Sequence, residues 1–133
     1  MSHDVGSDLA TKMGTDVAGI TLVTNLFAST VRAPDSDIPV DAVFVWPSGS
    51  LPPLRTMGEP DEIRAAAVHV RARDAVYATG MTLAILIHDT LRGLAVSNYL
   101  ELKAGNSAPI AMGTDELGFH LFGLEFVMTY ISD

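Results

Sequence analysis

The sequence predicts one α+β domain: a largely antiparallel, mixed β-sheet with an N-terminal helix and one long helix packed on one of its faces. Three observations lead to this fold class. The 133 residues are enough for a single domain, residues 1–133, and contain no linker-like tract. Hydrophobic residues make up 48% of the chain and charged residues 18%, so a core can be buried. The apolar period changes from helix to strand, back to helix and again to strand.

The first half of the chain predicts one helix followed by two strands. Apolar residues recur every three to four positions over residues 5–20, which places them on one stripe of a helix. The period then becomes two, so residues 22–31 predict a strand, and the two prolines of residues 34–39 predict a turn. Residues 41–46 are apolar and rich in β-formers, and residues 47–49, Pro-Ser-Gly, are expected to end this strand.

The middle of the chain predicts a strand that leads into the long helix. Residues 50–60 hold three prolines and predict a loop or at most an edge strand. Residues 64–73 alternate between a core face and a wet face. Asp74 is expected to cap a helix over residues 75–92 that ends at Gly93. The core face of the strand holds Ala66, Val68, Val70 and Ala72, and the core stripe of the helix holds Val76, Gly80, Leu83, Ala84, Ile87, Leu91 and Leu94.

The C-terminal part predicts a strand over residues 96–104, a long loop over residues 105–118 and a last strand over residues 119–131. The last strand carries the strongest hydrophobic signal, because five large side chains share one face: Phe122, Leu124, Phe126, Met128 and Tyr130. Burying each stabilises the fold by roughly 1.5–3 kcal/mol. This strand and the long helix are therefore expected to form the centre of the core.

Composition excludes several classes of function. The 16 acidic and 8 basic residues give a formal net charge of −8, which argues against a protein that coats nucleic acid or docks on anionic lipid. The absence of cysteine excludes disulfides, cysteine-ligated zinc and thiol nucleophiles. The first residues lack a signal-peptide pattern, so synthesis without export is expected. The longest apolar run, residues 81–87, is far shorter than the roughly 20 residues that span a bilayer.

Catalytic motifs are not found, and no cofactor is expected. The sequence has no phosphate-binding glycine loop, nucleophile elbow, zinc-protease motif or calcium-binding loop. The histidines are far apart, although His69 and His120 lie on predicted strands. His88 and Asp89 point about 100° apart on a helix, so a solvated helix face is expected there rather than a base with its carboxylate. A small metal-dependent hydrolase using His69, His88 or His120 is the weakest hypothesis.

Several residues instead predict contacts with other subunits. Trp46 is either a core plug or an interface anchor. Tyr77, Met81 and Ile85 widen the apolar arc of the long helix, and the proline-rich loop adds apolar side chains, which indicates either an oligomer contact or ordinary core. Arg64, Arg71 and Arg73 predict salt bridges within or between chains rather than phosphate binding. The candidate contact residues are Trp46, Leu51, Leu54, Arg71, Arg73, Tyr77 and Met81.

Seven stretches, in this order, carry a resemblance to a known family: ITLVTNLF (20–27), the Pro34-Asp35 turn, AVFVW (42–46), VHVRAR (68–73), DTLRGL (89–94), APIAMGTDELG (108–118) and the aromatic last strand. They resemble the tail terminator, or minor capsid, proteins of long-tailed, siphovirus-type bacteriophages. Members of that family are small α/β proteins that form a six-fold ring at the head-proximal end of the tail tube, stop its growth and face the head-completion proteins.

The resemblance implies a non-enzymatic virion protein at the head-tail junction, assembled in the host cytoplasm. Its implied partners are further copies of itself, the tail tube protein and a head-completion or connector protein. DNA would pass through the ring without sequence-specific binding, and acidic walls suit that passage. Arg71 and Arg73 match the arginine-bearing strand of the family, and Asp115 and Glu116 match the loop before its last strand. Another neck protein, such as a head-completion or adaptor protein, is the nearest alternative.

Overall fold

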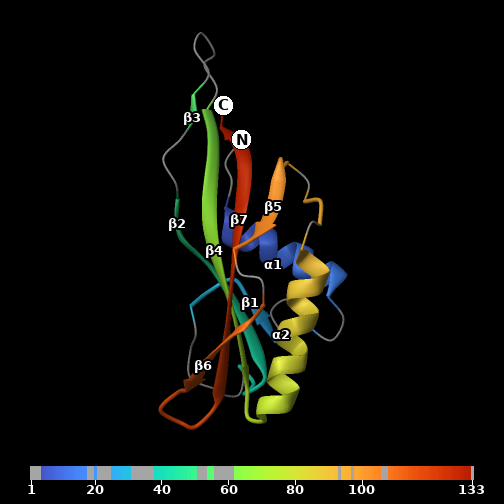
Figure 1. Cartoon of the computed structure of the whole chain (residues 1–133), viewed down its shortest axis with the longest axis vertical. Helices are drawn as coiled ribbons and strands as arrows, with labels where there is room; N and C mark the ends of the chain where they lie inside the picture. Colours follow the sequence, from blue (N-terminus) through green and yellow to red (C-terminus); the bar gives the residue numbers. More distant parts are fainter. Residues whose placement is uncertain are drawn as a thin grey trace.

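A computed structural model describes residues 4–17, 20, 25–30, 38–50, 54–55, 62–92, 94–96, 98–105 and 108–132. In this part of the chain, two helices, α1 (Val5–Asp16) and α2 (Tyr77–Leu91), pack on one mixed sheet (Figure 1). Its strands are β1 (Leu26–Phe27), β2 (Ala42–Ser50), β3 (Leu54–Arg55), β4 (Glu62–Asp74), β5 (Glu101–Ala104), β6 (Ile110–Thr114) and β7 (His120–Ser132). The predicted α+β class is confirmed.

The two longest strands, β4 and β7, form the spine of the sheet. They pair antiparallel over 13 residues each, from Glu62 opposite Ser132 to Asp74 opposite His120. The strand order is β1-β2-β4-β7-β5, with β3 also on β4 and β6 also on β7. β1 runs parallel to β2 and every other pairing is antiparallel, so the sheet is mixed but largely antiparallel.

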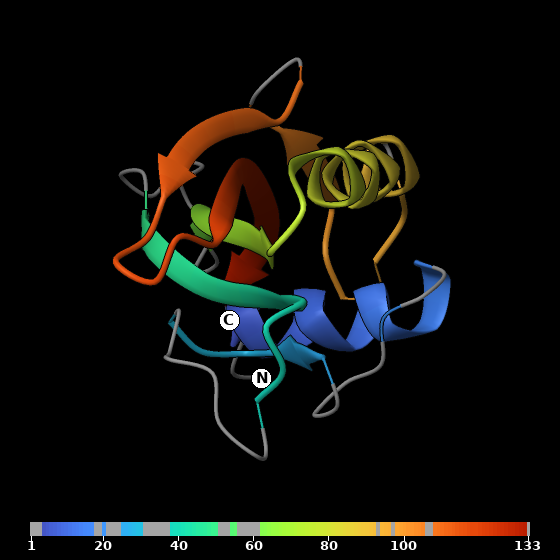
Figure 2. The same ribbon diagram turned by 90° about the horizontal axis from the view of Figure 1, so that it is seen from below.

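The main core lies between the helices and one face of this sheet. Alternate residues of a strand share a face, and the predicted core residues of β4 and β7 are buried together with α1 and α2 side chains. Figure 2 shows both helices on the same side of the curved sheet. The side chains at the centre, each 0% exposed, are Leu9, Met13, Val68, Ile87, Leu91, Phe122 and Met128.

A second, smaller cluster lies at β1 and β2 and is separate from the main core. Phe27, Ile38, Ala42 and Phe44 are buried in it, and Trp46 packs against them. The rings of Phe27 and Phe44 are stacked with their centroids 5.8 Å apart. Alternation along β2 explains the division, because Val43 and Val45 belong to the main core while Phe44 and Trp46 point to the other face.

Four predicted segments differ from the observed strands. β2 continues through Pro47 to Ser50, because a bulge between Pro47 and Gly49 accommodates the proline. The predicted loop over residues 105–118 contains β6, which pairs with β7. The predicted strands over residues 22–31 and 96–104 are reduced to β1 and β5 where described. Residues 21–24, 31–37, 51–53 and 56–61 lie outside the described residues, including the turn at residues 34–37.

The start of the long helix also differs from the prediction. Asp74 ends β4 instead of capping the helix, because it is held in register opposite His120. Its Oδ1 accepts a hydrogen bond from the Val76 backbone N–H at 2.8 Å, and α2 begins at Tyr77 with Val76 as its N-cap. Val76 was expected in the core stripe but is 55% exposed. The predicted end at Gly93 lies outside the described residues.

Candidate assembly surfaces

Trp46, His69 and Arg71 gather on the sheet face that the helices leave open. Trp46 and His69 are cross-strand partners with ring centroids 5.6 Å apart, and the Arg71 guanidinium carbon lies 5.3 Å from the centre of the Trp46 ring. On β7, Arg71 lies opposite Gly123, which brings no side chain. Among the described residues, Arg71 Nε is buried without a hydrogen-bond partner. Arg71 as a whole is only half-buried, so a carboxylate from outside could pair with the part of its side chain that is accessible, although not with the buried Nε.

Arg73, two residues along the same strand, is used within its own chain. It is 1% exposed, and it donates hydrogen bonds from Nε to Val40 O at 3.0 Å and from Nη2 to Pro39 O at 2.9 Å. Burial lowers the pKa of the Arg73 guanidinium, while Asp115 and Asp41 oppose the shift. The prediction that this face of β4 is exposed to solvent is therefore wrong at Arg73. Arg73 holds the chain before β2 and offers no accessible surface to a neighbour.

The three strand arginines do not form one basic patch. Arg64 is an odd number of residues from Arg71 and Arg73, so strand alternation places it on the other face of β4. It is exposed there, opposite Tyr130 of β7. Each arginine has a different environment, which removes the multiple adjacent cations that phosphate binding needs.

The outward side of α2 is apolar and nearly uncharged. We call Ala78, Thr79, Thr82, Ile85 and Leu86 the α2 outer surface; all five are exposed. Asp89 is the only Asp, Glu, Lys or Arg among the 15 residues of the helix. A shallow cavity of about 420 Å³ lies along this side, lined by Ala78, Thr79, Thr82, Leu83 and Leu86. Water-exposed helices usually present charged side chains there, so this surface is typical of a contact site.

The two helix residues predicted as contacts are placed differently. Tyr77 is half exposed at the start of α2, where its ring meets His120 and Phe122 at centroid distances of 5.6 and 5.3 Å. Met81 packs partly buried against the main core. Tyr77 therefore borders the α2 outer surface, whereas Met81 lies on the inner side of the helix, against the main core.

The β6–β7 hairpin, residues 110–120, forms a second exposed apolar surface. Asp115 shapes its tip, because Oδ1 accepts hydrogen bonds from the Leu117 and Phe119 backbone N–H groups at 2.9 and 3.0 Å. Gly118 completes the turn at a φ of +85° that favours glycine. The hairpin exposes Glu116 and three large apolar side chains: Ile110, Met112 and Leu117. Leu117, at 63%, is the most exposed of these.

The histidines do not converge. β4 and β7 are neighbours as expected, but His69 lies opposite Glu125 and His120 opposite Asp74, five positions apart along the sheet. His88 is 3% exposed rather than solvated, and its Nδ1 lies 3.5 Å from Asp89 Oδ1. Among the described residues, no group of three or more His, Asp or Glu side chains is arranged to hold a metal ion.

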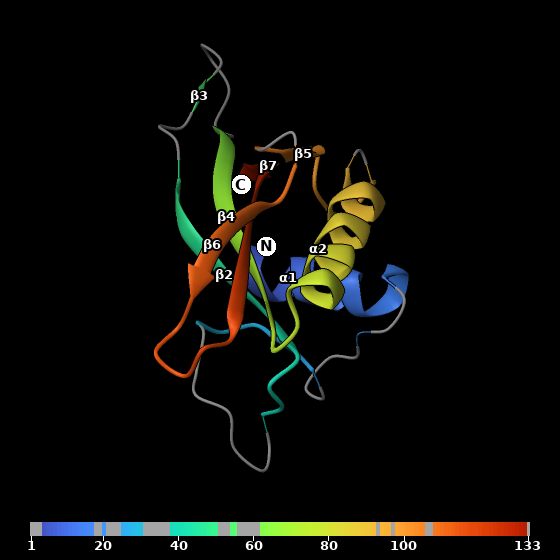
Figure 3. The same cartoon turned by 60° about the horizontal axis from the view of Figure 1, so that its bottom comes forward.

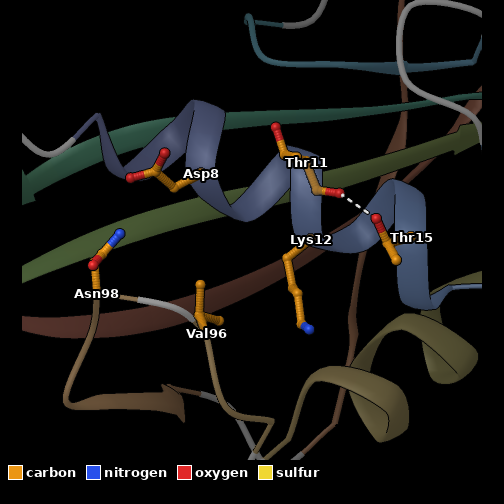
Figure 4. A pocket seen from close by; sticks show the side chains of 6 residues that line it. All are labelled: Asp8, Thr11, Lys12, Thr15, Val96 and Asn98. Carbon is orange, nitrogen blue, oxygen red and sulfur yellow. Dashed lines mark hydrogen bonds between the residues drawn. The ribbon is translucent and has the colours of Figure 1, made fainter.

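A polar pocket of about 310 Å³ lies between α1 and the segment before β5 (Figure 4). Its polar groups interact within the chain. Asp8 accepts a hydrogen bond from the Tyr99 hydroxyl at 2.5 Å, Lys12 pairs with Asp16 at 2.9 Å, and the Thr15 hydroxyl donates to the Thr11 carbonyl at 3.2 Å. The pocket is therefore a structural junction rather than a site with free polar groups.

The remaining predicted contact residues lie in the proline-rich segment and the hairpin. Leu51 lies outside the described residues, and Leu54 belongs to β3, whose backbone pairs with Ile63. Asp115 and Glu116 are at the hairpin tip, where Asp115 orders the turn. Prediction from sequence missed four of the exposed large apolar residues on these surfaces, Leu86, Ile110, Met112 and Leu117. The absence of charge over residues 77–88 was the signal that could have pointed to Leu86.

Comparison with known proteins adds no relative. The chain matches no protein-family model, and the search of curated proteins finds no similar sequence. Neither helix in the described ranges is long and apolar enough to cross a membrane.

Proposed function

We propose that this protein is a structural component of a bacteriophage virion, a tail terminator. It would assemble as a six-fold ring at the head-proximal end of the tail tube, stop tube polymerisation and join the tail to the head connector. Its partners would be other copies of itself, the tail tube protein and a head-completion protein, with DNA passing through the ring. The mechanism is geometric and requires no catalytic residue or cofactor.

One observation carries the proposal beyond the sequence resemblance. The chain exposes two apolar surfaces, the α2 outer surface and the β6–β7 hairpin, on a domain whose core is already complete. Exposed apolar groups of this size mark protein contacts. Two different surfaces on one small domain suit a protein that joins neighbours on two sides, as a ring subunit does.

Of the two alternatives, one shares the structural support of this proposal and the other does not. A head-completion or adaptor protein would also need contact surfaces, so the same observation supports it, and only its position in the particle separates it from a terminator. A metal-dependent hydrolase would need ligands that converge on one point. His69, His88 and His120 are separated in the described fold, so this hypothesis gains nothing from the structure.

The experiment that tests the proposal is antibody-gold labelling of intact particles from a lysate in which the gene is expressed, viewed by negative-stain electron microscopy. We expect label at the head-tail junction. A deletion of the gene then separates the two neck roles, because loss of a terminator gives tails of uncontrolled length. Particles without label, when the antibody does detect the protein in disrupted virions, would reject a location at the exposed neck surface and with it the proposal.

Arg71 offers a second test of the same function. Arg71→Glu reverses the charge beside Trp46 at a half-buried position, so the chain should fold while ring formation and infectivity fall at least tenfold. Arg71→Lys keeps the charge and is the matched control, with a smaller loss. Normal infectivity of the Arg71→Glu phage would remove this strand from the interface.

A further inference from the structure

We propose that the β6–β7 hairpin of one copy inserts Leu117 into the cavity on the α2 outer surface of the next copy. This proposal rests on the proposed function and specifies which two surfaces join neighbouring subunits. The occupant of the α2 cavity is thus a second copy of this chain. The two surfaces are suited to each other in their fit, their charge and their position on the domain.

The fit is that of an ordered apolar knob and an apolar cavity. The two hydrogen bonds to Asp115 hold the hairpin tip, and a third, from the Asp115 N–H to Phe119 O at 2.9 Å, closes it. Leu117 therefore projects from an ordered turn and loses little conformational freedom on binding. The cavity along α2 is large enough to admit a leucine, and Ala78, Leu83, Leu86 and two threonines line it.

Charge directs the acidic hairpin tip to α2 rather than to α1. Asp115 and Glu116 make the tip negative. The outer side of α1 carries Asp4, Asp8 and Asp16 against one cation, Lys12, which pairs with Asp16, so its net negative charge repels the tip. α2 has no acidic residue in its first turn, and its helix dipole adds a partial positive charge there.

The hairpin tip and α2 lie apart on the domain, although the base of the hairpin adjoins the start of α2 through His120 and Tyr77. In Figures 1, 2 and 3 the hairpin tip lies at the left and α2 at the right, so the tip is directed away from the α2 of its own chain. A contact between two different surfaces is heterologous, and repetition of it produces a ring or a filament rather than a closed pair.

The size of each surface indicates how firmly two copies associate. Three or four large side chains that are about half exposed present roughly 300–400 Å² of apolar area, against about 800 Å² per partner in a standard stable interface. The contact alone is therefore weak. A covalent trap is the appropriate measurement, and the chain contains no natural cysteine to interfere with it.

The test uses single-cysteine variants of the full chain. Leu86→Cys marks the cavity, Leu117→Cys marks the hairpin tip, and Thr11→Cys marks the exposed side of α1 as a matched control. Each variant is incubated alone and in pairwise mixtures with a mild oxidant at high protein concentration, and dimers are quantified on a non-reducing gel. A disulfide needs Cα atoms within about 7 Å. We expect at least tenfold more dimer in the Leu86→Cys and Leu117→Cys mixture than in any other sample.

Other results would overturn the inference. Dimer in Leu86→Cys alone would show that two α2 surfaces meet face to face, and dimer in Leu117→Cys alone would show that two tips meet. If the Thr11→Cys and Leu117→Cys mixture gave as much dimer as the Leu86→Cys and Leu117→Cys mixture, or if no sample gave dimer, the hairpin tip would have no specific binding site on α2. Gold label at the head-tail junction together with such a result would reject this interface and leave the proposed function standing.

Discussion

The two helices pack on the same face of the same sheet but have opposite outer surfaces. α1 carries Asp8, Lys12 and Asp16 among its 12 residues, and Lys12 pairs with Asp16 at 2.9 Å. α2 has only Asp89 among its 15 residues and exposes Ile85 and Leu86 instead. Both helices bury their inner side, so the sheet does not explain the difference. The charged outer side of α1 suits contact with water, and the uncharged outer side of α2 is the one for which we propose a protein contact.

The helices also differ in how closely they approach the sheet. On α2, a Cβ added at Gly80 would lie 2.4 Å from Phe122 Cε2 and 2.9 Å from Asp74 Cβ. On α1, a Cβ added at Gly6 would lie 3.0 Å from Pro47 Cδ, which is tight but much less so. α2 therefore approaches β4 and β7 more closely at Gly80 than α1 approaches β2 at Gly6, although both contacts are tight.

The largest expected effect comes from filling that close approach. Gly80→Ala gains up to about 1 kcal/mol of helix propensity but forces Phe122 or Asp74 to move, and overpacking a core costs about 1–3 kcal/mol. Both neighbours are buried, so they have little space to yield. We expect a net loss of about 2 kcal/mol in the free energy of unfolding, measured by urea denaturation.

Gly6→Ala is the matched control on α1. Its clash is slight and its gain in helix propensity has the same sign, so the free energy of unfolding should stay within about 1 kcal/mol of the parent protein. If Gly80→Ala proved as stable as Gly6→Ala, α2 would not be the more tightly packed helix, and the proposed difference in packing between the two helices would be wrong.

The sequence predicted the inner sides of both helices because burial is periodic. The apolar spacing is confirmed within α1 and along β4 and β7, where only Tyr130 is partly buried, since a helix or strand face that meets the core must be apolar at regular spacing. The helix predicted over residues 5–20 was too long, because α1 ends at Asp16, and Val17 and Ile20 are buried outside it. The ends of the helices and strands were less predictable. Asp74 has the side chain of a helix cap, yet its pairing opposite His120 extends β4 and moves the start of α2 to Tyr77.

The candidate site was predictable only in part, because exposure and side-chain direction depend on the tertiary fold. Trp46 and Arg71 are brought together by the register of β2 and β4, which no local pattern reveals. Arg73 has the same strand parity as Arg71, and its burial depends on the chain before β2 passing over it. The hairpin was missed because Gly113 and Gly118 make residues 105–118 look like a loop.

An intermediate effect is expected at the polar junction of α1. The Tyr99 hydroxyl donates to Asp8 at 2.5 Å, so Tyr99→Phe removes a hydrogen bond to a charged group and should lower the free energy of unfolding by about 1 kcal/mol at pH 7. Asp8→Asn keeps the shape of the hydrogen-bond acceptor, so it should lower the free energy of unfolding by less than Tyr99→Phe does.

The same tyrosine makes stability depend on pH. Burial, followed by the hydrogen bond to Asp8, raises the pKa of Tyr99 above its ordinary value of 10.0. The folded state therefore favours the neutral hydroxyl, and its contribution is complete below pH 10 and declines as the pH rises above 10. The stability gap between the parent protein and Tyr99→Phe should narrow between pH 9 and pH 11 in parallel urea titrations. A constant gap would show that Tyr99 ionises equally in both states.

The smallest effect on stability should come from the α2 outer surface, for which we propose a role in assembly. Leu86→Glu places a carboxylate on the α2 outer surface, where Leu86 is 40% exposed, so the free energy of unfolding should change by only about 0.5 kcal/mol. Thr11→Glu makes the same change on the exposed side of α1 and is the matched control. Because the new charge repels an acidic hairpin tip, Leu86→Glu should reduce self-association at least tenfold in sedimentation velocity, while Thr11→Glu should not. Equal loss in both variants would mean that net charge controls association, and the contrast between the two helices would then have no functional meaning.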